Sequence, residues 1–202
     1  MRSAPGAAPL LLLAALVACD QTAPASETPR EQTAALSPAT ALPPVISTVA
    51  WPAAASLDRG ALAALPRKAA HVAMKSQVPV LVPPRRELLA APVIVTRQHW
   101  TSFWARTEEL TVSLMMTRLS RKVPSIPPLR GAHSVRGKPA LVTVNEGIWS
   151  AAWAENGVSY ALDVECASPE APPCASDALV RELAAELVYV GGAGASAAGG
   201  PR

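Results

Sequence analysis

Residues 148–166 read IWSAAWAENGVSYALDVEC, and this stretch decides the fold. Asn156 and Gly157 stand between two segments in which apolar residues alternate with small or polar ones. Both residue types tolerate the positive φ of a type I′ turn, and such a pair between alternating segments is the strongest short-range signal for a β-hairpin. We therefore predict strands over residues 148–154 and 158–165, joined by a tight turn.

Further strands are predicted upstream of this hairpin. Residues 78–82 and 92–96 are β-branched runs beside prolines, which is typical of short strands at sheet edges. Residues 100–106 and 111–117 predict a second hairpin that turns around 107–110, and residues 140–144 predict one more strand. Residues 119–140 contain four prolines and two glycines without a clear period, and we expect a loop there.

Helices are expected on both sides of the strands. Apolar spacing over residues 57–65 predicts a helix that breaks near Leu65, and Pro66 can open a second segment that runs to about Ser76. A last helix is predicted from about Ala178 to Val190, with one apolar face. Because strands and helices do not alternate regularly, we predict an α+β class: an antiparallel sheet of about five to seven strands with an N-terminal and a C-terminal helix packed on it.

The N-terminus carries a targeting signal. Arg2 precedes the apolar run LLLLAALV at residues 10–17, which is too short to span a bilayer as a helix. The following Leu16-Val17-Ala18-Cys19 resembles the lipobox of bacterial lipoproteins. The resemblance implies that residues 1–18 are a signal peptide, that the Cys19 thiol carries a diacylglycerol, and that the new amino terminus is acylated. It places the protein in the cell envelope, held to a membrane by its lipid and facing the periplasm or the exterior.

The remaining chain divides by composition. Residues 19–54 hold the lipidated cysteine and a tether rich in Pro, Ala and Thr, which cannot bury enough apolar surface to fold alone. Residues 55–190 are predicted to form a single domain, and residues 191–202 a disordered Gly/Ala tail. The net charge of +3 is too small to indicate a nucleic-acid partner.

The cysteines beyond the anchor make a pair. Cys166 and Cys174 are expected to form a disulfide, because an even pair in an oxidising compartment is usually structural. A redox pair or a metal site is the alternative, but no Cys-x-x-Cys occurs and the three histidines (His71, His99 and His133) show no ligand spacing. We predict no metal and no cofactor.

The aromatic residues offer the best candidate for binding. Five Trp stand against two Tyr and one Phe, and Trp100/Trp104 and Trp149/Trp153 repeat a four-residue spacing. In a strand, each pair lies on one face and forms a stripe. Each stripe either packs in the core or forms an exposed platform that stacks on a sugar ring or buries an apolar residue of a partner.

Three functions remain open. We find no nucleophile elbow, zinc-protease or phosphate-loop motif. Asp163 and Glu165 fit an acid/base pair, a cation site or a solvated polar face. The leading hypothesis is a non-enzymatic, lipid-anchored module that binds or scaffolds an envelope protein or glycan. The alternatives are an envelope hydrolase that acts on cell-wall or lipid material, and an inhibitor or immunity-type lipoprotein.

Overall fold

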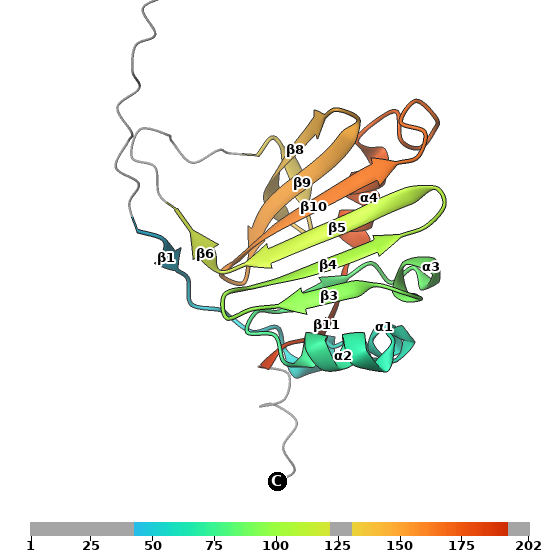
Figure 1. The fold of residues 1–202 in the computed structure, drawn as a ribbon. Coiled ribbons are helices and arrows are strands. Elements are labelled where there is room, and N and C mark those ends of the chain that lie inside the picture. The colour runs from blue at the N-terminus through green and yellow to red at the C-terminus, as the bar shows by residue number, and fades with distance from the viewer. Residues whose placement is uncertain (1–42, 122–130, 194–202) are drawn as a thin grey trace, which may run out of the picture. The chain divides into compact units, whose positions relative to one another are not determined.

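A computed structural model describes residues 43–121 and 131–193, so Cys19, the predicted signal peptide and most of the predicted tether lie outside the described residues. The main feature is a seven-stranded antiparallel sheet in the order β3-β4-β5-β10-β9-β8-β7 (Figure 1). Its strands are β3 (Val93–Thr96), β4 (Trp100–Arg106), β5 (Leu110–Thr117), β7 (His133–Val135), β8 (Lys138–Asn145), β9 (Ile148–Glu155) and β10 (Val158–Cys166). The predicted α+β class, dominated by an antiparallel sheet, is confirmed.

The sheet consists of two meanders that share one long seam. Strands β3, β4 and β5 follow one another across one half, and β7 to β10 do so across the other. Strand β10 pairs antiparallel with β5 from Ser159↔Thr117 to Cys166↔Leu110, and with β9 from Val158↔Glu155 to Glu165↔Ile148. The predicted hairpin of residues 148–165 is therefore confirmed and lies at the centre of the sheet.

Three of the hairpins turn on residues with positive φ. Asn156 and Gly157 have φ values of 55° and 75°, as the sequence predicts, and Glu146 and Gly147 repeat the pattern. Arg136 and Gly137, at 53° and 73°, turn β7 into β8. The predicted loop over residues 119–140 is therefore wrong at both ends, because β7 and β8 form a hairpin and β6 (Leu119–Ser120) pairs with β1 (Val45–Ile46).

Short helices and two two-stranded sheets accompany the main sheet in the described residues, and one of these sheets is the β1–β6 pair. The other elements are η1 (Ala54–Ser56), α1 (Arg59–Ala64), α2 (Arg67–Met74), α3 (Arg86–Leu89), α4 (Ala178–Glu186), and the paired strands β2 (Val80–Val82) and β11 (Val188–Gly191). The prediction that the last helix reaches Val190 is wrong. The chain turns extended at Leu187, with ψ of 131°, because the β-branched residues that follow gain ladder hydrogen bonds by pairing with β2.

One face of the seven-stranded sheet is buried. Helix α4 contacts β9 and β10 and lies behind them in Figure 1, while α2 contacts β3 and α3 contacts β4. The inward side chains alternate along each strand with outward ones, as Val112, Leu114 and Met116 do on β5. Burial of these apolar side chains, at about 25 cal/mol per Å², is the main term that stabilises the fold.

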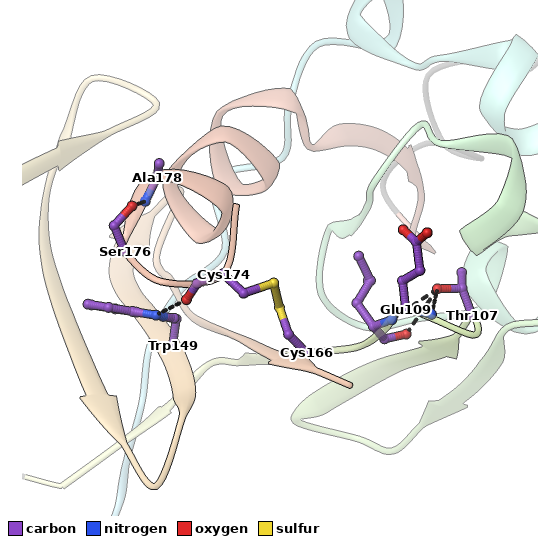
Figure 2. Close-up of a disulfide and its surroundings, with 8 residues drawn as sticks. Thr107, Glu109, Trp149, Cys166, Cys174, Ser176 and Ala178 are labelled. Atoms are coloured by element: carbon purple, nitrogen blue, oxygen red, sulfur yellow. Dashed lines mark hydrogen bonds between the residues drawn. A yellow bond between two sulfur atoms is a disulfide. The ribbon is translucent and has the colours of Figure 1, made fainter. Parts of the chain in front are cut away.

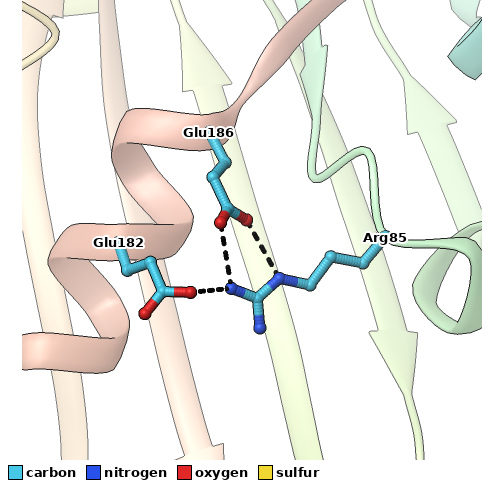
Figure 3. Close-up of polar contacts among 3 residues, drawn as sticks. All are labelled: Arg85, Glu182 and Glu186. Carbon is cyan, nitrogen blue, oxygen red and sulfur yellow. Dashed lines mark hydrogen bonds and ion pairs between the residues drawn. The ribbon is translucent and has the colours of Figure 1, made fainter.

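An ion-pair cluster ties α4 to the segment before α3 (Figure 3). The Arg85 guanidinium donates from Nε to Glu186 at 2.9 Å and from Nη2 to Glu182 at 2.6 Å. The hydrogen bond to Glu186 raises the pKa of Arg85, so the guanidinium is charged at neutral pH. A fork of this kind fixes orientation as well as charge, and it sets α4 against the segment that leads into α3.

The end of the predicted tether contacts the sheet. The backbone N–H of Ser47 donates to the Arg118 carbonyl, and that of Ala50 donates to the Asn156 carbonyl. A Cβ built on Gly157 would lie 2.0 Å from the Thr48 carbonyl oxygen. The Asn156-Gly157 turn is therefore a docking point for the chain that arrives from the N-terminus.

This contact gives a matched test. Gly157→Ala should lower the free energy of unfolding by about 1 kcal/mol more than Gly137→Ala, measured by urea denaturation. Both glycines have φ near 75°, so both variants carry the same backbone strain, but nothing lies within 4 Å of a Cβ at Gly137. Equal losses would show that residues 48–50 do not pack on the turn in solution.

Candidate functional site: the outer face of the sheet

The side chains that alternate with the core residues form the outer face of the sheet. We define this outer face by its central strands. It consists of Trp100, Ser102, Trp104 and Arg106 on β4, Thr111, Ser113, Met115 and Thr117 on β5, Ser159, Ala161, Asp163 and Glu165 on β10, Ile148, Ser150, Ala152 and Ala154 on β9, and Leu141 and Thr143 on β8. All of these residues are exposed or half-buried.

A polar row crosses the middle of this face. The strand register places Trp104 opposite Ser113, Ser113 opposite Asp163, and Asp163 opposite Ser150. The Ser150 hydroxyl donates to Asp163 Oδ1 at 2.6 Å, and the Ser113 hydroxyl donates to Oδ2 at 3.4 Å. The carboxylate is thus held in one orientation by hydroxyls of two neighbouring strands.

A shallow groove of about 420 Å³ runs beside this polar row. Its floor is the next row of the register, from Met115 on β5 through Ala161 and Ala152 to Leu141 on β8. Thr117 and Ser159 also line it, together with Ala154, and form the opposite rim. On β5 and β10 the apolar floor therefore lies between two rims that carry hydroxyl groups, this one and the polar row.

Large exposed apolar side chains gather next to the Met115 end of this groove. Trp104 in the polar row and Met115 on the groove floor are each 41% exposed, and Val93, which pairs with Trp104 from the edge strand β3, is 51% exposed. Exposed large apolar groups beside a fixed polar group are a common feature of binding surfaces. The outer face is thus the strongest candidate for a binding site among the described residues.

The structure separates the two tryptophan pairs predicted from the sequence. Trp100 and Trp104 lie on the outer face. Trp149 and Trp153 lie on the opposite face, because Trp149 precedes the outer residue Ser150 and Trp153 is 4% exposed and stacked on Tyr160 at 5.2 Å. The four rings therefore form two separate stripes, of which only the first faces outward.

Trp149 instead supports the disulfide (Figure 2). Its indole Nε1 donates to the Cys174 carbonyl at 2.9 Å. Cys174 is joined to Cys166 at the end of β10, with 6.3 Å between the two Cα atoms, which is the pairing that the sequence predicts. The loop of residues 167–173 is thereby fixed to the strand before it and to a side chain of β9.

A second concave site lies on the other side of the sheet, at the end near the Asn156-Gly157 turn. It is a cavity of about 630 Å³ whose lining includes Arg136, Glu155 and Tyr160. Arg136 Nε donates to Glu155 at 2.9 Å, and its Nη1 donates to the Leu187 carbonyl. Burial raises the pKa of Tyr160 well above its ordinary value, with a further contribution from Glu155, so this hydroxyl is a donor at neutral pH.

The polar groups at this cavity are mostly engaged in holding the fold. Arg136 joins the β7–β8 turn to the end of β9 and to the residue after α4. Tyr189 Oη, on a residue that also lines the cavity, is buried without a hydrogen-bond partner among the described residues. The sequence gives no signal for this cluster, because Arg136, Glu155 and Tyr189 come from three separate segments.

In residues 43–121 and 131–193, no three His, Cys, Asp or Glu side chains gather as a metal site would require. His99 Nδ1 accepts from Arg118 Nε at 3.2 Å, and His133 lies 3.8 Å from Asp177. The described part of the chain contains no helix that is both long and apolar enough to span a bilayer.

Comparison with known proteins does not identify a function for the outer face. Neither a protein-family model, nor a curated protein, nor a solved structure matches the chain. The function is therefore argued from the arrangement of the residues alone.

The disulfide has a measurable effect on stability. Replacing both cysteines in a Cys166→Ser/Cys174→Ser variant should lower the free energy of unfolding by about 2 to 3 kcal/mol, because the bridge closes a short loop in the unfolded chain. Urea denaturation with and without a reductant checks this. The reductant should destabilise the wild type and leave the double variant unchanged, and a wild type that does not respond would contradict the bridge.

Proposed function

We propose that this protein is a lipid-anchored component of the bacterial cell envelope that binds another envelope component through the outer face of its sheet. The observation that carries the proposal is the outer face itself, where exposed Trp104 and Met115 lie beside a carboxylate held by Ser113 and Ser150. Such a face has large contact groups and one oriented polar group, which together favour specific binding.

The anchor is proposed on the resemblance of residues 16–19 to a lipobox. One acyl chain gives only marginal membrane residence, whereas a diacylglycerol with an acylated amino terminus holds a protein stably. From Asp20 to Pro44 the chain is rich in Ala, Pro and Thr, and its 25 residues could extend to about 85 Å at most. A tether of this kind lets the folded part reach components that lie away from the membrane surface.

Binding is proposed in preference to hydrolysis because of the surroundings of Asp163. Both of its oxygens accept hydrogen bonds from serine hydroxyls, and no histidine is among its hydrogen-bond partners in the described residues. Activation of a serine for attack commonly uses a histidine that is held by a carboxylate, and this arrangement has none. The carboxylate remains well suited to accept hydrogen bonds from a ligand.

The anchor is tested by Cys19→Ala. The wild-type protein should enter the detergent-rich phase on Triton X-114 phase separation, and the Cys19→Ala variant should stay in the aqueous phase because it has no site for the diacylglycerol. Mass spectrometry of the N-terminal peptide should show a modified Cys19. An unmodified Cys19 in protein from the native envelope would contradict the anchor.

The binding face is tested with envelope fractions. Immobilised wild-type protein should retain envelope material that a Trp104→Ala/Met115→Ser variant does not retain, because these two residues hold the exposed apolar contact area. Val144→Ala is the matched control, since Val144 is 52% exposed on a strand but belongs to the opposite face, in register with Trp149. Equal retention by all three proteins would contradict binding through the outer face.

A further inference from the structure

Polar and apolar rows of side chains lie next to one another on the outer face. Along β5, Ser113, Met115 and Thr117 succeed one another on this face, and along β10 the order is Asp163, Ala161 and Ser159. The register aligns these positions, so on β5 and β10 hydroxyl or carboxylate groups lie on each side of the apolar groove floor. The side chains of the floor are small or flexible, which leaves the groove open to a flat ligand.

From this pattern we propose that the groove binds an uncharged saccharide chain, with the flat C–H faces of its rings on the floor and its hydroxyls on the two rims. The proposal rests on the proposed function and names the ligand class of that same face. A sugar ring has apolar faces and a perimeter of hydroxyl groups. The groove presents the complementary arrangement, because its floor is apolar and its rims accept and donate hydrogen bonds.

The dimensions agree with one ring across the groove. Ser113 and Thr117 are four residues apart on β5, which places the two rims about 13 Å apart at a rise of about 3.3 Å per residue. A hydrogen bond of about 2.8 Å at each edge takes up nearly half of this distance. The remainder is the width of a single sugar ring, so a chain would run along the groove, perpendicular to the strands. At its β4 end the floor row meets Ser102, and Trp104 lies beside it in the polar row.

The charges of the outer face favour a neutral ligand. Its formal charges are Arg106, Asp163 and Glu165, a sum of −1, and of these only Asp163 lies in the row next to the groove floor. Within the described residues no cation forms an ion pair with Asp163, and its hydrogen-bond partners are serine hydroxyls. An acidic glycan or a phosphate group would place a like charge beside this carboxylate, whereas sugar hydroxyls can donate to it.

The composition also distinguishes a saccharide from a protein partner. The cores of protein–protein interfaces are depleted in Ser and Ala, and Ser and Thr are rare among their hot spots. The outer face has Ser, Thr or Ala at more than half of its positions. Trp104 is the exception that suits both partners, because an indole stacks on sugar rings as well as on apolar side chains.

The proposal is tested with soluble oligosaccharides and the mature full-length protein in detergent. N-acetylchitotetraose, an uncharged chain, should bind saturably in isothermal titration calorimetry and change the tryptophan fluorescence. A hyaluronan tetrasaccharide, of equal length with two carboxylates, should bind at least about tenfold more weakly, which corresponds to 1.4 kcal/mol. Asp163→Asn should reduce the difference in affinity between the two tetrasaccharides, because it removes the charge that repels the acidic one.

A groove-filling variant supplies the structural control. Ala152 is exposed on the groove floor, so Ala152→Phe should abolish binding by occupying the groove without entering the core. Val144→Phe adds the same ring at an exposed position of the opposite face and should leave binding unchanged. Unchanged urea denaturation midpoints would show that both variants fold.

The outcomes separate this proposal from the proposed function. No saturable binding of the neutral chain, or binding that Ala152→Phe leaves intact, would overturn the saccharide groove. A second outcome is that envelope material is retained in a Trp104-dependent manner and that this retention is lost after the material is treated with protease. The outer face would then bind a protein, and only the saccharide proposal would fail. If neither the oligosaccharide nor envelope material bound, both proposals would fail.

Discussion

The register of strand β10 is the constraint on which the rest of the structure depends. This strand pairs with β5 on one side and β9 on the other, and it joins the two meanders into one sheet. Because side chains alternate with period two, a slip of one residue would turn Leu162 and Val164 outward and bring Asp163 into the core. The burial of the apolar set and the position of the carboxylate are therefore fixed by the same set of backbone hydrogen bonds.

Local alternation made much of this sheet predictable. The Asn156-Gly157 turn and the alternating residues after it define a hairpin without reference to the rest of the chain. The Arg136-Gly137 turn was missed because arginine carries no turn signal, and it adopts positive φ here while its guanidinium binds Glu155 and the Leu187 carbonyl. Residues 188–190 were misassigned for a related reason: their apolar spacing also suits a helix, and only the distant strand β2 favours the extended form.

The candidate site could be predicted only in part, because a site on a sheet is a property of several strands. The four-residue spacing correctly places Trp100 with Trp104 on one face and Trp149 with Trp153 on one face. Spacing within a strand says nothing about whether two strands present the same face, and here the pairs are opposed. The contacts of Asp163 could not be predicted from the sequence either, since Ser113 is 50 residues away and Ser150 is 13 residues away along the chain.

The two tryptophan pairs lie on opposite faces of the seven-stranded sheet and have different roles. Trp153 stacks on Tyr160 inside the core and Trp149 holds the Cys174 carbonyl, so the inner pair makes β9 and β10 rigid from behind. The disulfide extends that support to the end of β10. The outer residues on these same strands, including Asp163 and Ser150, then need little reordering when a ligand arrives. Since immobilising side chains and loops is a major cost of association, a shallow groove of small side chains can be selective only if its backbone is already fixed.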